Sequence, residues 1–181
     1  MIFLTIHVCK HTLIGKEKMD KDFPYIVRVV VEIPKGSRNK YEYDPDSGRM
    51  KLNRVLSSAV HYPADYGFAE DTRAEDGDEV DVLVLIEEPT FPGCLVEAKP
   101  IGYLEMHDEK GGDNKVLAVP LSDPRWGDIK DLYELPPSLL DEIENFFLTY
   151  KRLESKEVTS DGWYNSRKTL DYLNVSRCPS S

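Results

Sequence analysis

The sequence predicts an α+β fold that is mainly β: a closed antiparallel barrel with helices packed outside it. Two observations support this prediction. Short apolar runs separated by Pro- and Gly-containing turns occupy the chain from residue 26 to residue 119, and such runs are typical of small barrels and sandwiches. After Pro136-Pro137 the apolar residues adopt a helical spacing, so the helices are expected to follow the strands.

The expected strands begin at residues 26–33, where β-branched residues dominate. Turns at 34–39 and 44–48 enclose a half-buried strand at 40–43, in which charged and aromatic residues alternate. The chain then returns over residues 49–56, which completes a meander. Further short strands are expected in the apolar runs 82–86, 94–104 and 116–119.

Two helices are expected in the last third of the chain. Ser138 can serve as the N-cap of the first helix. Its apolar residues recur at i, i+4, i+7, i+8 and i+11 and share one face: Leu139, Ile143, Phe146, Phe147 and Tyr150. A shorter helix is expected from Ser166 to Leu173.

Residues 21–181 are expected to form a single domain, because a chain of 181 residues suits one core and no linker or repeat interrupts it. Residues 1–20 are treated as an N-terminal extension without an assigned structure. The apolar stretch Met1–Cys9 is too short to span a membrane. No candidate site residue precedes Glu32, so a protein that begins at Met19 is expected to fold and to keep its activity.

The net charge of −10 bears on the class of partner. Proteins that bind nucleic acid normally present a basic face to the phosphates, whereas this chain has no long Lys/Arg cluster. We therefore expect no nucleic-acid partner. If the protein binds a small phosphate compound, bound cations have to offset its own negative field.

The three cysteines, Cys9, Cys94 and Cys178, are far apart and lack metal-ligand spacing. This argues against a disulfide framework or a zinc site and favours a reducing compartment, so a cytoplasmic location is expected.

The most informative segment is residues 70–81, in which seven of twelve residues are acidic. Asp76 and Asp78 flank a glycine, and Asp81 begins an apolar run. A second Gly-rich turn carries Asp108 and Asp113. One such run can be a solvated turn, but two favour a site for several hard cations such as Mg²⁺, Mn²⁺ or Ca²⁺, which prefer oxygen ligands.

A calcium-binding EF-hand loop is a poor interpretation of the first run. Val80 stands at its fifth position, and Asp81 stands where the sharp turn needs glycine. The paired-metal interpretation fits better. Paired metal ions can generate a hydroxide nucleophile and stabilise both sides of a displacement at phosphorus.

A phosphate compound also needs cationic and hydroxyl contacts, for which the chain offers several candidates: Lys40, Arg54, Tyr62, Tyr66, Lys115, Tyr150 and Lys151. Each has a structural alternative. The charged residues can be solubilising groups at strand edges, and Tyr150 fits the apolar helix face, where core packing accounts for it. Glu32 and Glu42 can likewise belong to an exposed sheet face.

These elements resemble, in collinear order, the soluble family I inorganic pyrophosphatases of the short, prokaryotic type. The matching segments run from Glu32 to Lys151: Glu32-Ile33-Pro34, Lys40-Tyr41-Glu42, Asn53-Arg54, Tyr62-Pro63-x-x-Tyr66-Gly67, Asp76-Gly77-Asp78-x-x-Asp81, Asp108-x₄-Asp113-x-Lys115 and Phe146-Phe147-x-x-Tyr150-Lys151. The sequence differs from the family pattern at Glu79, where proline is usual, at His61, which replaces an aromatic ring, and after Lys151, where a Lys-Trp pair is common.

The resemblance implies a closed five-stranded OB-like barrel with flanking C-terminal helices. It also implies a homo-oligomer, often a hexamer, that hydrolyses pyrophosphate to two phosphates with several Mg²⁺ ions, or other divalent cations, per site. Asp78 would act as the general base on the water that bridges the metals, which gives the attacking hydroxide. By position, direct metal ligands would be Asp76, Asp81, Asp108 and Asp113, with Glu32 acting through water. Phosphate contacts would be Lys40, Arg54, Tyr66, Lys115, Tyr150 and Lys151.

Two other classes remain as alternatives. A metal-dependent nucleotide phosphohydrolase would need a pocket for the base, for which Trp126 and Trp163 are the aromatic candidates. An OB-like binding module would usually have a basic groove, which the sequence lacks.

Overall fold

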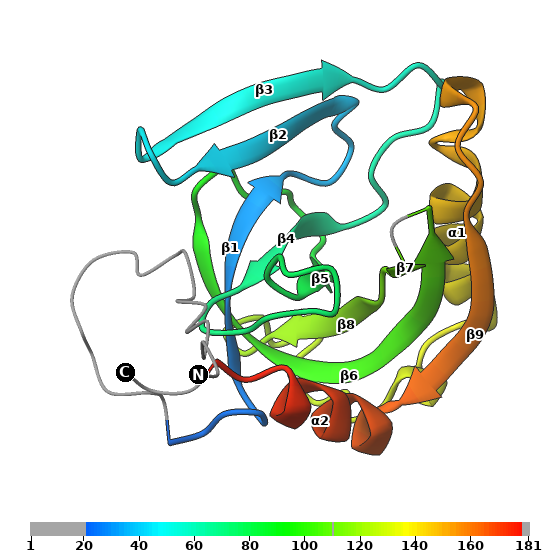
Figure 1. Ribbon diagram of the computed structural model, residues 1–181. Helices are drawn as coiled ribbons and strands as arrows, with labels where there is room; N and C mark the ends of the chain where they lie inside the picture. Colours follow the sequence, from blue (N-terminus) through cyan, green and yellow to red (C-terminus); the bar gives the residue numbers. More distant parts are fainter. Residues whose placement is uncertain (1–20, 110, 179–181) are drawn as a thin grey trace, which may run out of the picture.

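The computed structural model describes residues 21–109 and 111–178. Strands are the main regular structure of the described chain, and Figure 1 shows them curving around a common centre. The strands are β1 (Val27–Ile33), β2 (Asn39–Asp44), β3 (Arg49–Val55), β4 (Asp65–Ala69), β5 (Asp81–Val84), β6 (Leu95–Asp108), β7 (Gly111–Gly112), β8 (Lys115–Pro120) and β9 (Thr159–Asn165). The helices are α1 (Pro137–Thr149) and α2 (Ser166–Val175), with short 3₁₀ turns η1 (Leu132–Glu134) and η2 (Arg152–Glu154).

The main sheet forms a ring of strands in the order β1-β4-β5-β8-β6, which the pairing of β6 with β1 completes. β7 and β9 extend the sheet by pairing with β6. β2 and β3 form a separate two-stranded hairpin, which lies above one end of the ring in Figure 1. A mainly β fold with few helices is therefore confirmed.

The expectation of a wholly antiparallel arrangement is wrong at one place, because β5 and β8 run parallel. Parallel neighbours need a long crossover connection, and residues 85–114 provide it. This segment contains the long strand β6, which pairs antiparallel with β8. As a consequence β5 and β8 begin side by side, with Asp81 opposite Lys115.

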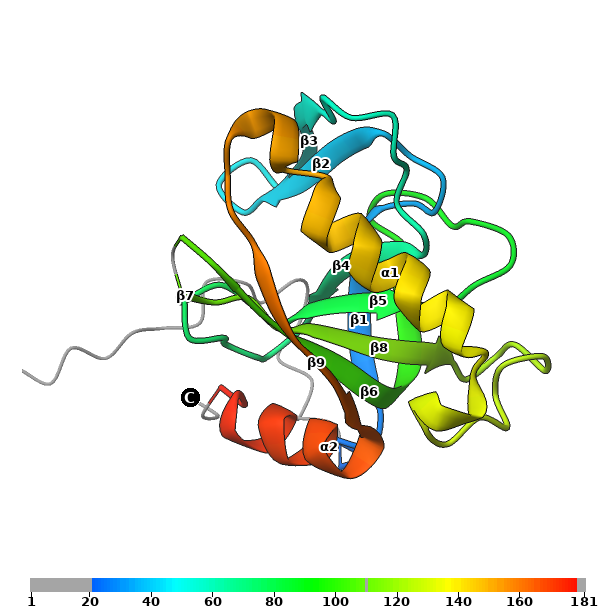
Figure 2. The same ribbon diagram turned by 90° about the vertical axis from the view of Figure 1, so that its right-hand side faces the viewer.

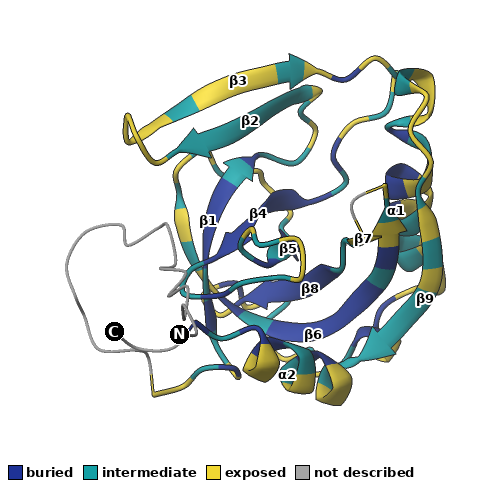
Figure 3. Cartoon of the chain, in the orientation of Figure 1, coloured by how far each residue is buried: buried dark blue, intermediate teal, exposed yellow. Residues whose placement is uncertain are grey.

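The ring strands β5 and β8 are buried on both faces, as Figure 3 shows. In β5, Leu83 packs in a core cluster that includes the apolar face of α1, whereas Val82 and Val84 pack in a second cluster with Leu173 of α2. The same alternation occurs in β8. Two-sided burial explains why these strands read as continuous apolar runs. Figure 2 shows α2 lying beneath β6 and β9.

Both helices occur where their patterns predict them. Ile143, Phe146, Phe147 and Tyr150 are buried on the expected face of α1. Ser138 is not the N-cap, however, because α1 begins at Pro137 and Pro136 holds the cap position without a side-chain hydrogen bond. Proline suits the first helical position, where its missing N–H has no intrahelical partner.

The cysteine prediction is wrong at Cys178, which is disulfide-bonded, whereas Cys94 is a free thiol. The predictions for Met1–Cys9 and for a protein that begins at Met19 concern residues 1–20, which lie outside the described residues. No helix in the described part of the chain is long and apolar enough to cross a membrane.

Candidate active site

The candidate site lies where β5 and β8 begin. Asp81 and Lys115 are the first residues of these strands and are register partners. Because side chains alternate along a strand, both belong to the face that also carries Leu83 and Leu117, on the side of α1. The Lys115 ammonium group is buried and donates to the carboxylates of Asp81 and Asp113.

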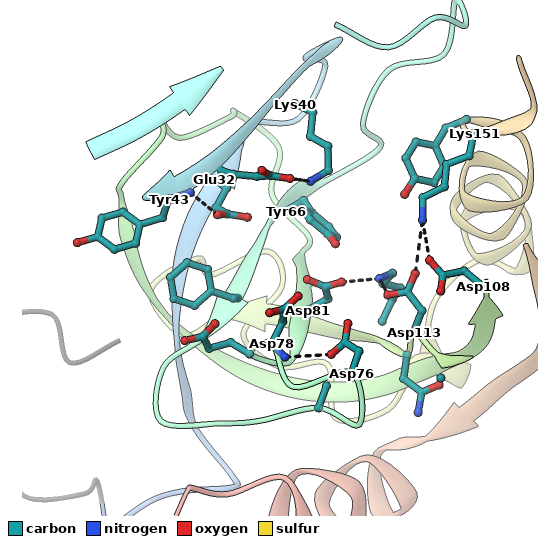
Figure 4. Close-up of a pocket in the computed structure, with 18 of the residues that line it drawn as sticks. Glu32, Lys40, Tyr43, Tyr66, Asp76, Asp78, Asp81, Asp108, Asp113 and Lys151 are labelled. Carbon is teal, nitrogen blue, oxygen red and sulfur yellow. Dashed lines mark hydrogen bonds and ion pairs between the residues drawn. The ribbon is translucent and has the colours of Figure 1, made fainter. Parts of the chain in front are cut away.

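The loop before β5 carries the remaining residues of the first acidic run. The backbone N–H of Asp78 donates to the Asp76 side chain at 3.1 Å, and both residues line the pocket (Figure 4). Between them Gly77 has a φ of 93°, a left-handed conformation that favours glycine. The Arg73 guanidinium donates to the Gly77 carbonyl, which fixes the turn.

The end of β6 and the end of α1 supply the opposite wall. Asp108 is the last residue of β6 and accepts a hydrogen bond from the Lys151 ammonium group at 3.0 Å. The same ammonium nitrogen lies 4.0 Å from the Asp113 carboxylate. Figure 4 shows Lys151 pointing from the α1 side toward these two aspartates. Tyr150 precedes it and is buried against the core.

β1 and the β2–β3 hairpin supply the third wall. The Glu32 carboxylate accepts a hydrogen bond from the backbone N–H of Tyr43 at 2.7 Å. Burial raises the pKa of Glu32 to about 7, so this group titrates near neutral pH. Lys40 donates to Glu42 at 2.6 Å, and Arg54 lines the same wall.

Gly67 fixes the position of Tyr66 on β4. A Cβ atom at Gly67 would lie 1.9 Å from the carbonyl oxygen of Val30, so only glycine allows β4 to approach β1 this closely. Burial raises the pKa values of Tyr66 and Tyr150. Both phenols therefore stay protonated at neutral pH and can donate a hydrogen bond.

All twelve residues predicted for the site line one pocket of about 550 Å³, a usual volume for a small-molecule site. They are Glu32, Lys40, Arg54, Tyr66, Asp76, Asp78, Asp81, Asp108, Asp113, Lys115, Tyr150 and Lys151. Tyr62 is instead buried in the core next to Phe146, so packing accounts for it.

The pocket carries an excess of negative charge. Among the described residues, nine acidic and five basic side chains line it. Burial lowers the pKa of Lys115. The neighbouring carboxylates of Asp81 and Asp113 outweigh this effect and raise the pKa above its usual value, so Lys115 stays charged. Burial raises the pKa of Asp113, an effect that Lys115 partly offsets.

The donor set fits hard cations, since carboxylates from three separate segments share one pocket. Within the described residues, no group of three such side chains is gathered closely enough to hold a metal ion as the structure stands. Lysine ammonium groups bind several of these oxygens instead. Lys115 binds carboxylate oxygens of Asp81 and Asp113, and Lys151 binds one of Asp108.

Several pocket residues were not predicted as site residues. Lys156 and Glu109 form an ion pair at 2.8 Å, and both line the pocket. Glu79 also lines it, although the sequence marks this residue only as a departure from the family pattern. The proximity of Glu79 to Asp78 and Asp81 in the chain is the one signal that could have found it.

The comparisons with known proteins agree with one another. The profile of the family described as "Inorganic pyrophosphatase" matches residues 29–177. A protein of Methanosarcina acetivorans called "Inorganic pyrophosphatase" is 51% identical over 149 residues, 82% of this chain and 89% of its own length. One of the same name from Halalkalibacterium halodurans is 52% identical over 155 residues, 86% of this chain and 94% of its own.

Among solved structures, the crystal structure of an inorganic pyrophosphatase from Thermus thermophilus superposes with a TM-score of 0.85. The two sequences are 46% identical, and the aligned region covers 93% of this chain and 95% of the Thermus thermophilus chain. The fold and the charged pocket thus belong to a phosphate-handling hydrolase. More particularly, the chain belongs to the inorganic pyrophosphatase family, the enzymes that hydrolyse pyrophosphate.

Proposed function

We propose that this enzyme hydrolyses pyrophosphate to two phosphates in the described pocket, with Mg²⁺ or a similar divalent cation as an essential cofactor. The observation that carries the metal requirement is the charge of the pocket. Pyrophosphate is a polyanion, and acidic residues outnumber basic ones nine to five among the described residues that line the pocket. Cations from solution have to make up the difference.

Asp76, Asp81, Asp108 and Asp113 would hold these cations directly, and Glu32 would do so through water. Divalent cations supply charge stabilisation at phosphorus and lower the pKa of water. The ammonium groups of Lys115 and Lys151 donate to oxygens of three of these aspartates. Cations bound to the same oxygens would release the two ammonium groups toward the substrate.

The remaining pocket residues bind and orient the reactants. Lys40, Arg54, Lys115 and Lys151 neutralise the phosphate oxygens, and the protonated phenols of Tyr66 and Tyr150 donate to them. Asp78 accepts the proton of the attacking water as the general base, because it lies on the solvent-facing turn beside the proposed ligands Asp76 and Asp81.

The substrate is expected to be pyrophosphate and not a nucleotide. The two aromatic candidates for a base-binding pocket, Trp126 and Trp163, pack against the core and do not line the site. Neither tryptophan can therefore serve as the surface for a nucleotide base in this pocket.

The remaining proposals concern the whole molecule. The ring β1-β4-β5-β8-β6 would be the closed five-stranded OB-like barrel of the family, within one domain of residues 21–181. The protein would act as a homo-oligomer, for which a hexamer is the first arrangement to test by light scattering.

The test of the function measures phosphate release from pyrophosphate and from ATP, each with Mg²⁺ and with a chelator. We expect rapid release from pyrophosphate with Mg²⁺, none with the chelator, and far slower release from ATP. Robust hydrolysis in metal-free buffer would contradict the metal requirement. Equal rates on the two substrates would favour a nucleotide phosphohydrolase. If no phosphate is released from either substrate, a binding module would be favoured.

A further inference from the structure

Two residues outside the pocket hold the guanidinium group of Arg54. Glu154 accepts a hydrogen bond from Nε at 3.1 Å, and the side chain of Asn53 accepts one from Nη1 at 3.1 Å. Arg54 lines the pocket, whereas neither Glu154 nor Asn53 does. The second terminal nitrogen, Nη2, has no hydrogen-bond partner in the described part of the chain. Two nitrogens are thus committed to the protein, and one remains for a ligand.

The contact with Glu154 joins segments that are 100 residues apart in the chain. Arg54 belongs to β3, and Glu154 ends η2, one turn after Tyr150 and Lys151. The Glu154 side chain is 19% exposed and that of Arg54 is 31% exposed, so the pair is partly shielded from water. Since shielding and a charged acceptor strengthen a hydrogen bond, this contact differs from a typical surface ion pair.

The polar contacts continue from Arg54 to Lys40. The side-chain amide of Asn53 donates to one oxygen of Glu42 at 2.8 Å, and Lys40 donates to the other oxygen at 2.6 Å. The two hairpin cations that line the pocket, Lys40 and Arg54, are therefore linked through Asn53 and Glu42. Glu154 connects this chain of contacts to the segment after α1.

We propose that Glu154 is a positioning residue that, together with Asn53, fixes the Arg54 guanidinium plane so that Nη2 is directed to a phosphate oxygen. The proposal rests on the proposed role of Arg54 as a phosphate contact. Arginine recognises phosphate through a planar set of donors, so its orientation matters as much as its charge. Displacing a binding group by about 1 Å can cost as much as ~100-fold in rate.

The experiment is a double-mutant cycle between Arg54 and Glu154, read as KM and kcat for pyrophosphate. We expect Glu154→Ala to lower kcat/KM by about 10- to 100-fold. Glu154→Gln should restore most of this loss, because its amide oxygen still accepts from Nε. In the Arg54→Ala background, Glu154→Ala should have no further effect, since the residue that it orients is gone.

Lys51→Ala is the matched control. Lys51 forms an ion pair with Asp44 at 2.7 Å on the same hairpin but does not line the pocket, and its removal should leave kcat/KM unchanged. Thermal unfolding of every variant confirms that it is folded.

Three results would overturn the inference and leave the proposed function intact. A further loss from Glu154→Ala in the Arg54→Ala background would show that Glu154 acts on the fold in general. A gain in affinity in Glu154→Ala would show that Glu154 competes with substrate for Arg54. If Glu154→Gln behaves like Glu154→Ala, the charge and not the geometry matters. Full activity of Arg54→Ala would instead refute the phosphate-contact role in the proposed function, and the inference with it.

Discussion

Aspartates in two regions of the molecule have different kinds of hydrogen-bond partner. At the pocket, Asp81, Asp108 and Asp113 bind lysine ammonium groups. Away from it, Asp65 is fully buried and accepts from the backbone N–H groups of Lys35 and Thr90 and from the Thr90 hydroxyl.

Asp131 resembles Asp65. It accepts from the backbone N–H groups of Tyr133 and Ser166 and from the Ser166 hydroxyl. Backbone donors are fixed by the fold, so these contacts hold one conformation. Lysine side chains can move from a carboxylate to a ligand. The comparison indicates that Asp65 and Asp131 stabilise the fold, whereas Asp81, Asp108 and Asp113 can exchange a lysine partner for a ligand.

The largest effect is expected from Asp78→Asn. The amide keeps the shape of the side chain and one oxygen but removes the proton acceptor. Pyrophosphate turnover should fall by roughly 10²–10⁴-fold, with at most a modest change in the Mg²⁺ dependence. The measurement is kcat across a Mg²⁺ titration. Asp78→Asn with nearly full activity would mean that the acidic loop is only a solvated turn.

Asp81→Asn should act differently, because Asp81 is a proposed direct ligand. We expect a clear rise in the Mg²⁺ concentration that gives half-maximal rate, with part of the rate recovered at excess Mg²⁺. If excess Mg²⁺ rescues Asp78→Asn but not Asp81→Asn, the two roles are reversed.

A stability measurement tests the other side of the comparison. Asp65→Ala leaves three partly buried donors without their acceptor and should lower the free energy of unfolding by about 3 kcal/mol. Asp65→Asn keeps one acceptor oxygen and should cost about 1–2 kcal/mol. Urea denaturation measures both values. The folded variants should retain pyrophosphate turnover, and a loss of turnover at unchanged stability would place Asp65 in the catalytic machinery.

The regular elements that the sequence predicts are those with a strong local signal. The β-branched run of β1 and the helical spacing of α1 are examples. β4 and β9 were missed, since Asp65–Ala69 and Thr159–Asn165 each contain glycine and aspartate and show no clear alternation. Pairing with ring strands determines their conformation, which local propensity does not report.

The candidate site was predictable because its residues lie in short, recognisable segments. The contact between Arg54 and Glu154 was not, because it joins residues 100 positions apart and depends on how η2 lies against β3. The parallel pairing that places Asp81 beside Lys115 depends in the same way on the crossover through β6.

The smallest effect is expected at Asp131, the N-cap of η1. Although partial burial raises its pKa, hydrogen bonds from Ser166 and Tyr133 outweigh burial and lower the pKa below the usual value. A carboxyl group whose pKa is lower in the folded state stabilises the protein above its unfolded pKa, about 3.9, and this contribution disappears as the pH falls through the folded value.

Asp131→Asn should therefore cost about 1 kcal/mol in the free energy of unfolding at pH 7. The difference from the unmodified protein should shrink as the pH falls below about 4. Urea denaturation at several pH values measures this dependence, and pyrophosphate turnover at pH 7 should not change. A difference that stays constant across the pH range would show that shape, and not the charge of the carboxylate, accounts for the contribution of Asp131.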